Sequence, residues 1–313
     1  MSYDDPDNPS PAFATAAHRP RRRVGLVAVA ALVPVGLVGF LLWQGGSGSG
    51  GSGPAGAAPG ASEGSGKNPA PSVQPERSAS PSKSRPADAG ELTGKTVVID
   101  PGHNPNNRDH TADIARSVDI GTNKKECDTT GTATNDGYSE AEFTLDLARK
   151  VRTLLEKQGA TVKFTQDGDR SFGPCVDERA QIGNKADADA VISLHADGSG
   201  EGNRGFHVIM PGKVDAGAAD TGKIVGPSRD LGERLAGSFV RATGSAPSNY
   251  IGGGTGLDTR TDLGGLNLSK VPKVFLECGN MRDSRDEALL TSAAWRQKAA
   301  KGISEGIAGF LAT

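Results

Sequence analysis

The chain has 313 residues, of which 44 are glycine and 19 are proline, and aromatic residues make up only 4%. This composition indicates that part of the chain does not form a packed core. The 35 basic and 37 acidic residues give a net charge of −2, which excludes a protein that binds nucleic acid through bulk positive charge. We therefore expect no nucleic-acid partner.

The N-terminal region has the pattern of a membrane anchor. Residues 24–43 form a run of 20 residues without a charge, long enough to cross about 30 Å of hydrocarbon as a helix. Four arginines precede the run within residues 19–23, and the next basic residue is Lys67. The positive-inside rule therefore predicts a cytoplasmic tail over 1–23 and an extracytoplasmic remainder. A cleaved signal peptide is the alternative, although its apolar region usually has only about 7–15 residues.

The next segment has the composition of a linker. In residues 44–90, glycine, serine, alanine and proline supply 36 of 47 positions. Such a segment cannot bury enough apolar surface to offset the entropy lost on ordering. We expect a disordered linker over 44–91 and one folded domain over 92–313, which is long enough for a sizeable core.

Hydrophobic patterns predict the elements of this domain in chain order. Short apolar runs predict strands at 95–100, 161–165, 188–194, 206–210 and 273–278. Apolar residues at helical spacing predict helices at 140–158, 178–186, 227–243 and 292–311. The alternation of strands and helices predicts an α/β domain with a sheet flanked by helices.

The domain contains the three cysteines of the chain, Cys127, Cys175 and Cys278. Disulfides are permitted in an exported domain. Cys127 and Cys175 lie in predicted loops, whereas Cys278 lies in the last predicted strand. We predict a Cys127–Cys175 disulfide and a buried free Cys278, with the fully reduced form as the alternative.

Ionisable side chains stand at the ends of three predicted strands. His103 follows VVIDPG, His195 follows AVISL, and Glu277 ends VFLE. The carboxyl ends of adjacent parallel strands meet at one edge of a sheet, where open α/β sheets build their sites. Two imidazoles and one carboxylate, with a position left for water, are the ligands of a hydrolytic zinc site. The same donors also describe a non-haem iron site.

Four segments resemble a known family. They are VVIDPGHN (97–104), SEAEFTLDLARKVRTLLEKQG (139–159), DERAQIGNKADADAVISLHAD (177–197) and VFLECGN (274–280). In order and spacing they are similar to the zinc-dependent N-acetylmuramoyl-L-alanine amidases of the Amidase_3 type. The resemblance implies a single α/β domain with a mostly parallel sheet. It also implies zinc held by His103, Glu140 and His195, with Glu277 as the catalytic acid/base.

The choice of the liganding glutamate rests on this resemblance. In the family, that residue lies five positions before the first leucine of the helix, which selects Glu140. Glu142 lies further into the predicted helix, and Glu126 is a weaker candidate. Glu178 is assigned a structural role, because a carboxylate in the first turn of a helix is favoured by the helix dipole.

The chain departs from the usual family pattern at a few positions near the site. Asn104 and Pro105 stand where a second glycine is usual, Asp197 replaces an asparagine, and Cys278 replaces an apolar residue. None of these changes removes an implied ligand. The polar excursion over 104–139 shows little regular pattern, and we expect it beside the site.

The resemblance implies hydrolysis of the amide between N-acetylmuramic acid and L-alanine in peptidoglycan. Zinc would activate the water, and Glu277 would pass its proton to the departing amine. We expect a monomer at the cell wall, anchored in the membrane by residues 24–43. The alternatives are a peptidoglycan-binding or regulatory module without turnover, and a different metal enzyme.

Overall fold

The computed structural model describes residues 91–313. The predicted tail, membrane segment and linker over 1–90 lie outside these residues. Within the described part of the chain, no helix combines the length and the apolar character that a membrane span requires. Leu92, the first residue of the predicted folded domain, is buried, and its amide donates to the carbonyl of Gln158.

A six-stranded sheet forms the centre of the domain, with strand order β4-β1-β5-β10-β6-β9. Neighbouring strands are parallel except β6 and β10, which are antiparallel. The prediction of a mostly parallel sheet is therefore confirmed. The strands are β1 (Thr96–Pro101), β4 (Thr161–Phe164), β5 (Ala190–Asp197), β6 (His207–Pro211), β9 (Leu257–Arg260) and β10 (Lys273–Asn280).

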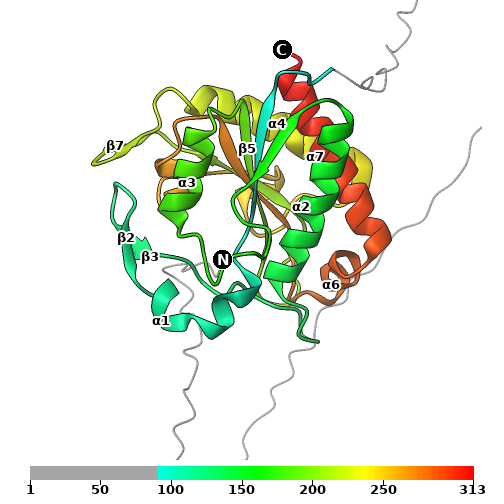
Figure 1. Ribbon diagram of the computed structural model, residues 1–313. Helices are drawn as coiled ribbons and strands as arrows, with labels where there is room; N and C mark the ends of the chain where they lie inside the picture. The colour runs from blue at the N-terminus through cyan, green and yellow to red at the C-terminus, as the bar shows by residue number, and fades with distance from the viewer. Residues whose placement is uncertain (1–90) are drawn as a thin grey trace, which may run out of the picture. The chain divides into compact units, whose positions relative to one another are not determined.

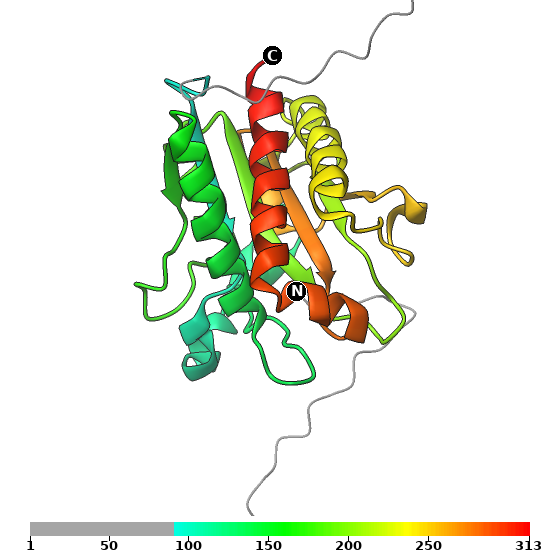
Figure 2. The same ribbon diagram turned by 90° about the vertical axis from the view of Figure 1, so that its right-hand side faces the viewer.

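Three long helices cover one face of this sheet, with α7 between α2 and α4 (Figure 2). They are α2 (Glu140–Lys157), α4 (Val225–Thr243) and α7 (Ala293–Leu311). The opposite face carries α3 (Val176–Lys185), as Figure 1 shows, together with the short α5 (Gly264–Asn267). Each long element predicted from the sequence is present, with ends that differ by at most three residues.

The alternation of side chains along the strands decides which residues reach which face. Ile192 and Leu194 of β5, with Leu276 of β10, belong to the large core beneath the three long helices. His195 and Glu277 follow these leucines in sequence and therefore point to the opposite face, which has less helical cover. The polar strand ends thus avoid the main hydrophobic core.

The excursion between β1 and α2 contains more regular structure than its sequence predicted. Its elements are η1 (Pro105–Asp109), α1 (Thr111–Ile114) and a hairpin of β2 (Ser117–Asp119) and β3 (Lys124–Glu126). The predicted Cys127–Cys175 disulfide is confirmed and joins this excursion to the start of α3, while Cys278 is free and buried. The remaining short elements are β7 (Asp215–Ala216), β8 (Ala219–Asp220), η2 (Gly252–Gly254) and α6 (Ser284–Leu290).

Candidate metal centre

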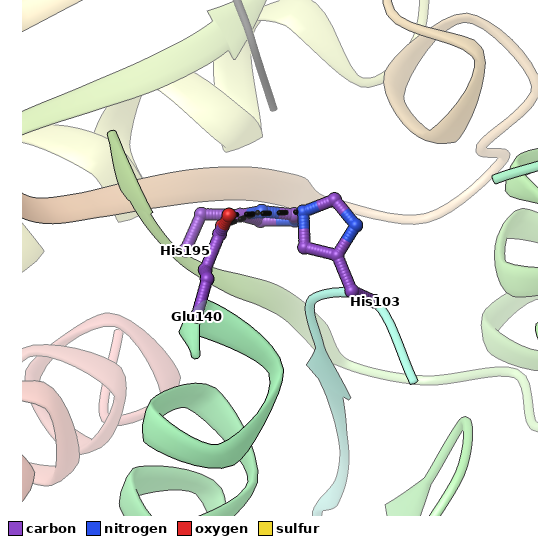
Figure 3. A group of neighbouring side chains, drawn as sticks. All are labelled: His103, Glu140 and His195. Atoms are coloured by element: carbon purple, nitrogen blue, oxygen red, sulfur yellow. Dashed lines mark hydrogen bonds and ion pairs between the residues drawn. The ribbon is translucent and has the colours of Figure 1, made fainter. Parts of the chain in front are cut away.

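Three buried side chains meet where β1 and β5 approach their carboxyl ends and α2 begins. His103, Glu140 and His195 each offer a ligand atom, and these atoms all lie within 4.8 Å of one another. Glu140 contacts both histidines (Figure 3), with Oε2 3.2 Å from His103 Nε2 and Oε1 2.8 Å from His195 Nδ1. The structure therefore brings together the three residues that the sequence resemblance selected as ligands.

Sheet register and helix capping explain this convergence. Strands β1 and β5 are adjacent and parallel, so that Pro101 pairs with Leu194 one step before His195. Glu140 is the first residue of α2, whose N-cap is Ser139. The start of this helix faces the sheet edge at which parallel strands of open α/β folds place their ligands.

Glycine permits the close packing around these groups. A Cβ atom on Gly102 would lie 2.4 Å from Cε1 of His195. Gly131 has φ +73°, and a Cβ there would lie 2.7 Å from His103 Cδ2 and 2.8 Å from Glu140 Oε2. A larger residue at either position would displace a candidate ligand.

The environment of Glu140 favours its ionised form. Its Oε2 accepts a hydrogen bond from the amide of Thr132 at 2.9 Å, and its Oε1 accepts one from the amide of Ala196 at 3.2 Å. Burial opposes ionisation, but the charge of His103 and the hydrogen bonds from both histidines outweigh it, and the pKa of Glu140 falls well below its ordinary value. The carboxylate is thus ready to bind a cation.

The two histidines differ in their electrostatic surroundings. Burial lowers the pKa of His195 to about 4, although Glu140 favours its charged form. Burial also opposes the charge of His103, but the carboxylates of Glu140 and Asp128 prevail and raise its pKa. His195 is therefore neutral at pH 7, which is the protonation state in which an imidazole binds a metal.

The geometry of the three groups suits a divalent metal. Two ligands bound about 2.1 Å from a tetrahedral zinc lie about 3.4 Å apart. Glu140 is 3.2 Å from His103 through Oε2 and 2.8 Å from His195 through Oε1, and one ligand atom from each residue lies within 4.8 Å of the other two. A bound cation would also neutralise the charge of the buried Glu140. Two histidines and one carboxylate leave one tetrahedral position for water or substrate.

Glu277 lies next to this group on the neighbouring strand. It is the register partner of His195 and is fully buried. Neither carboxylate oxygen has a hydrogen-bond partner among the described residues. Burial raises the pKa of Glu277 well above its ordinary value, and the nearby charges of Asp197 and Glu140 add to the rise. A buried carboxyl group without a partner is suited to exchange a proton with a ligand.

The other glutamates considered as candidates lie outside the group. Glu142 forms a capping box with Ser139 at the start of α2. Glu126 is exposed in β3. Glu178 pairs with Arg170 through hydrogen bonds of 2.9 Å and 3.1 Å in the first turn of α3, in accordance with the structural role predicted for it.

Comparison with known proteins agrees with this arrangement. Residues 97–309 match the Amidase_3 family, described as N-acetylmuramoyl-L-alanine amidase. The N-acetylmuramoyl-L-alanine amidase Rv3717 of Mycobacterium tuberculosis is 40% identical over 228 residues, which cover 72% of this chain and 90% of that protein. The chain belongs to the N-acetylmuramoyl-L-alanine amidase family.

Solved structures show the same relationship. The N-acetylmuramyl-L-alanine amidase Ami1 of Mycobacterium smegmatis is 41% identical, with a TM-score of 0.64 over 70% of this chain and 98% of that one. Ami1 of Mycobacterium abscessus is 39% identical, with the same TM-score over 70% of this chain and all of that one. Zinc dependence is typical of the amidase family.

The departures from the usual amidase pattern have structural roles. Asn104 caps η1 and donates to the carbonyl of Gly173 at 2.9 Å. Asp197 accepts a hydrogen bond from the hydroxyl of Tyr250 at 2.6 Å. Cys278 points into the large core as a small apolar residue. These residues support the surroundings of the site, and none of them replaces His103, Glu140 or His195.

Sequence reasoning missed Asp128, which lies against the far side of His103. The Nδ1 atom of His103 is 3.3 Å from Oδ1 of Asp128 and 3.1 Å from the carbonyl oxygen of Thr129. Both residues belong to the excursion, which therefore lies beside the site as predicted. The one available signal was the position of Asp128 directly after Cys127, which was expected to form a disulfide.

Proposed function

We propose that this protein is a zinc-dependent hydrolase that cleaves the amide bond between N-acetylmuramic acid and L-alanine in peptidoglycan. The observation that carries the proposal is the buried group of His103, Glu140 and His195, beside which the Glu277 carboxyl group has no hydrogen-bond partner among the described residues. Membership of the amidase family supplies the substrate class.

His103, Glu140 and His195 would hold the metal. When bound, zinc would acidify a water molecule and polarise the substrate carbonyl. Zinc is favoured over iron because the reaction is a hydrolysis without redox change and because the family is typically zinc-dependent. Metal analysis of the purified protein distinguishes the two, and iron at stoichiometric occupancy without zinc would contradict the assignment.

Glu277 would move the proton that the reaction requires. It accepts the proton of the attacking water and returns it to the amine nitrogen of L-alanine, which must be protonated to leave. A nearby bound cation favours the ionised form of a carboxyl group and so makes Glu277 a base. Its buried surroundings favour the protonated form, so that Glu277 becomes an acid once it has taken up the proton.

Digestion of purified peptidoglycan tests this function. The intact protein should release stem peptides with new L-alanine amino termini, detected by mass spectrometry, and chelation of the metal should stop the reaction. Glu277→Gln should retain zinc and lose turnover by at least about 10²-fold. Glu142→Gln is the matched control, because Glu142 lies outside the metal group.

Two results would overturn the proposal. Unchanged turnover by Glu277→Gln would remove Glu277 from the mechanism. Binding of peptidoglycan by the zinc-loaded intact protein with no new amino termini would favour the alternative of a binding or regulatory module.

We also propose that residues 24–43 anchor the protein in the cell membrane with the folded domain at the cell wall. The proposal rests on the uncharged 20-residue run and the arginines before it. The full-length protein should sediment with membranes and resist carbonate extraction. A mature protein in the medium that begins between Gln44 and Ser62 would show a cleaved signal peptide instead.

A further inference from the structure

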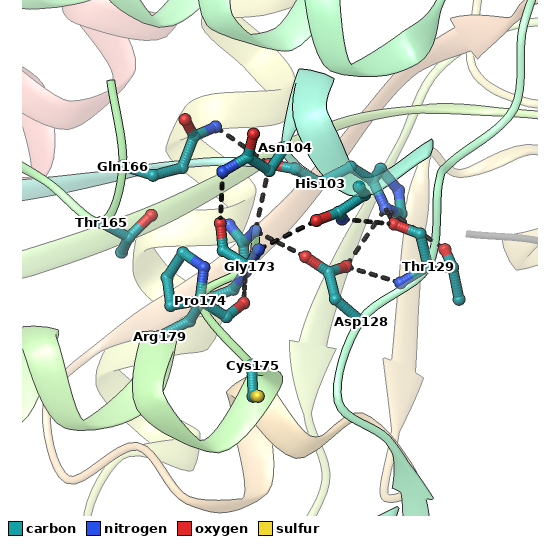
Figure 4. Close-up of polar contacts among 12 residues, drawn as sticks. His103, Asn104, Asp128, Thr129, Thr165, Gln166, Gly173, Pro174, Cys175 and Arg179 are labelled. Carbon is teal, nitrogen blue, oxygen red and sulfur yellow. Dashed lines mark hydrogen bonds and ion pairs between the residues drawn. The ribbon is translucent and has the colours of Figure 1, made fainter. Parts of the chain in front are cut away.

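A buried guanidinium group lies beside the metal group, by which we mean the side chains of His103, Glu140 and His195. It lies on the side of His103 away from Glu140. Arg179 of α3 is buried and uses all three of its nitrogens (Figure 4). Its Nε donates to Pro174 O at 2.8 Å, and its Nη1 donates to Asp100 Oδ1 at 2.8 Å and to Pro101 O at 2.7 Å. These contacts fix the guanidinium plane against the end of β1.

The remaining nitrogen of Arg179 connects two parts of the environment of His103. Nη2 donates to the carbonyl oxygen of His103 at 3.0 Å and to Oδ2 of Asp128 at 2.8 Å. The other oxygen of Asp128, Oδ1, faces Nδ1 of His103 at 3.3 Å. One guanidinium nitrogen thus bridges the backbone of His103 and the carboxylate that faces its ring.

The backbone of His103 needs such support. Its φ of 61° lies in the left-handed region, which is uncommon for residues other than glycine. Such a conformation persists only where surrounding contacts determine it. Besides Arg179, the side-chain amide of Gln166 donates to the His103 carbonyl at 2.9 Å.

Asp128 determines which ring nitrogen of His103 carries a proton. Nδ1 faces the acceptors Asp128 Oδ1 and Thr129 O, together with the hydroxyl oxygen of Thr129 at 3.2 Å, and these contacts favour a proton on Nδ1 when a metal takes Nε2. Nε2 is then the atom presented to Glu140 and to a metal. The other oxygen of Asp128, Oδ2, is paired with the guanidinium of Arg179 at 2.8 Å. This buried ion pair holds the Asp128 side chain against the ring.

The disulfide holds the two segments that carry these groups. Cys127 directly precedes Asp128, and Cys175 is the N-cap of the helix that carries Arg179. A backbone hydrogen bond links the same two segments, since the amide of Val176 donates to Cys127 O at 2.8 Å. The separation between Asp128 and Arg179 is therefore fixed by a covalent and a hydrogen-bonded link.

We propose that Asp128 and Arg179 are positioning residues that hold His103 in the orientation and tautomer required to bind the metal. The inference rests on the metal site of the proposed function. Carboxylates that orient a metal-binding histidine typically change metal affinity by about 10–100-fold when they are replaced. Neither residue is assigned contact with the metal or the substrate.

The zinc dissociation constant of the metal-free protein, measured by competition with a chromophoric chelator, tests this proposal. Asp128→Asn preserves the shape of the side chain but removes its charge, and it should raise the zinc Kd at least about tenfold. Arg179→Lys keeps the charge but offers one nitrogen in place of three, and it should have an effect of the same direction. Glu178→Gln is the matched control, because it disrupts an ion pair in the same turn of α3 and should leave the Kd within about twofold.

Thermal unfolding of each metal-free variant separates positioning from a general structural role. The Kd is measured well below each Tm, so that a residue that only stabilises the fold would change the Tm and leave the Kd unchanged. Folded Asp128→Asn protein with a wild-type Kd would overturn the proposal. Wild-type protein that fails to bind zinc would instead overturn the proposed metal site.

Histidine ¹⁵N NMR of the zinc-loaded wild-type protein gives a test that does not depend on variants. His103 should show a protonated Nδ1 and a metal-bound Nε2. An unprotonated Nδ1 would overturn the role of Asp128 even if the variants did not fold.

Discussion

Removal of the Cys127–Cys175 disulfide should lower the stability of the domain by a large and calculable amount. The two cysteines are 48 positions apart, and closing a loop of this size stabilises a protein by about 4 kcal/mol in the chain-entropy model. An unfolding entropy of about 2.1 cal/mol/K per residue, applied to the 223 described residues, converts this free energy into a decrease in Tm of about 9 °C.

The assay is calorimetry of the metal-free protein with and without a reductant, because bound zinc would stabilise the folded state separately. Reduction of the wild type and the substitution Cys127→Ala/Cys175→Ala should each lower the Tm by about this amount. The double variant should then be insensitive to reductant. Cys278→Ala is the matched control, because Cys278 is also buried but unpaired, and it should remain as sensitive to reductant as the wild type.

A small effect of reduction would refute the reasoning. If reduced wild-type protein unfolds within about 2 °C of the oxidised protein, the disulfide does not restrict the unfolded chain as the loop-entropy model requires. A double variant whose Tm still depends on reductant would show that Cys278 forms a disulfide with another molecule, since no other cysteine remains in that chain.

Three further predictions concern the metal group and pH. Glu140→Ala should lose stoichiometric zinc and Glu142→Ala should keep it; the reverse result would show that the wrong glutamate was chosen. Burial lowers the pKa of His207 in the folded protein to about 4, whereas a histidine in the unfolded chain has a pKa of about 6.5. As the pH falls, the unfolded state therefore takes up a proton first, and the folded state loses stability between about pH 6.5 and about pH 4. In urea unfolding of the metal-free protein, His207→Gln should therefore lose about 2 kcal/mol less than wild type between pH 7 and pH 5, and an equal loss would contradict the shift. Gly131→Ala would place a Cβ atom 2.8 Å from Glu140 and should weaken zinc binding at least about tenfold. Gly137→Ala is the control, because Gly137 also has a positive φ but faces open space, and it should leave zinc binding unchanged. Equal effects of the two substitutions would show that backbone strain, and not the contact with Glu140, weakens binding.

The long elements of the domain could be predicted from the sequence because their patterns are local. The apolar run of β5 reflects burial on both faces of the sheet, and the helical spacing of Leu147, Val151 and Leu155 in α2 reflects burial on one face; the structure confirms both. The edge strand β9 was not predicted. Its sequence LDTR has only one apolar residue, because an edge strand buries little, and its place is determined by pairing with β6.

The sequence by itself placed His103 just after a strand and paired Cys127 with Cys175, since strands and loops are visible in local patterns. It also placed His195 just after a strand, whereas in the structure β5 continues through His195 to Asp197. Only the tertiary structure revealed Arg179 as the link between the metal group and the sheet. From the sequence, Arg179 was one more charged residue at a helix start. Its partners Asp128 and Asp100 lie 51 and 79 positions away in the sequence. The burial of Arg179 depends on side chains from three separate segments, and no hydrophobic periodicity within any one segment can indicate it.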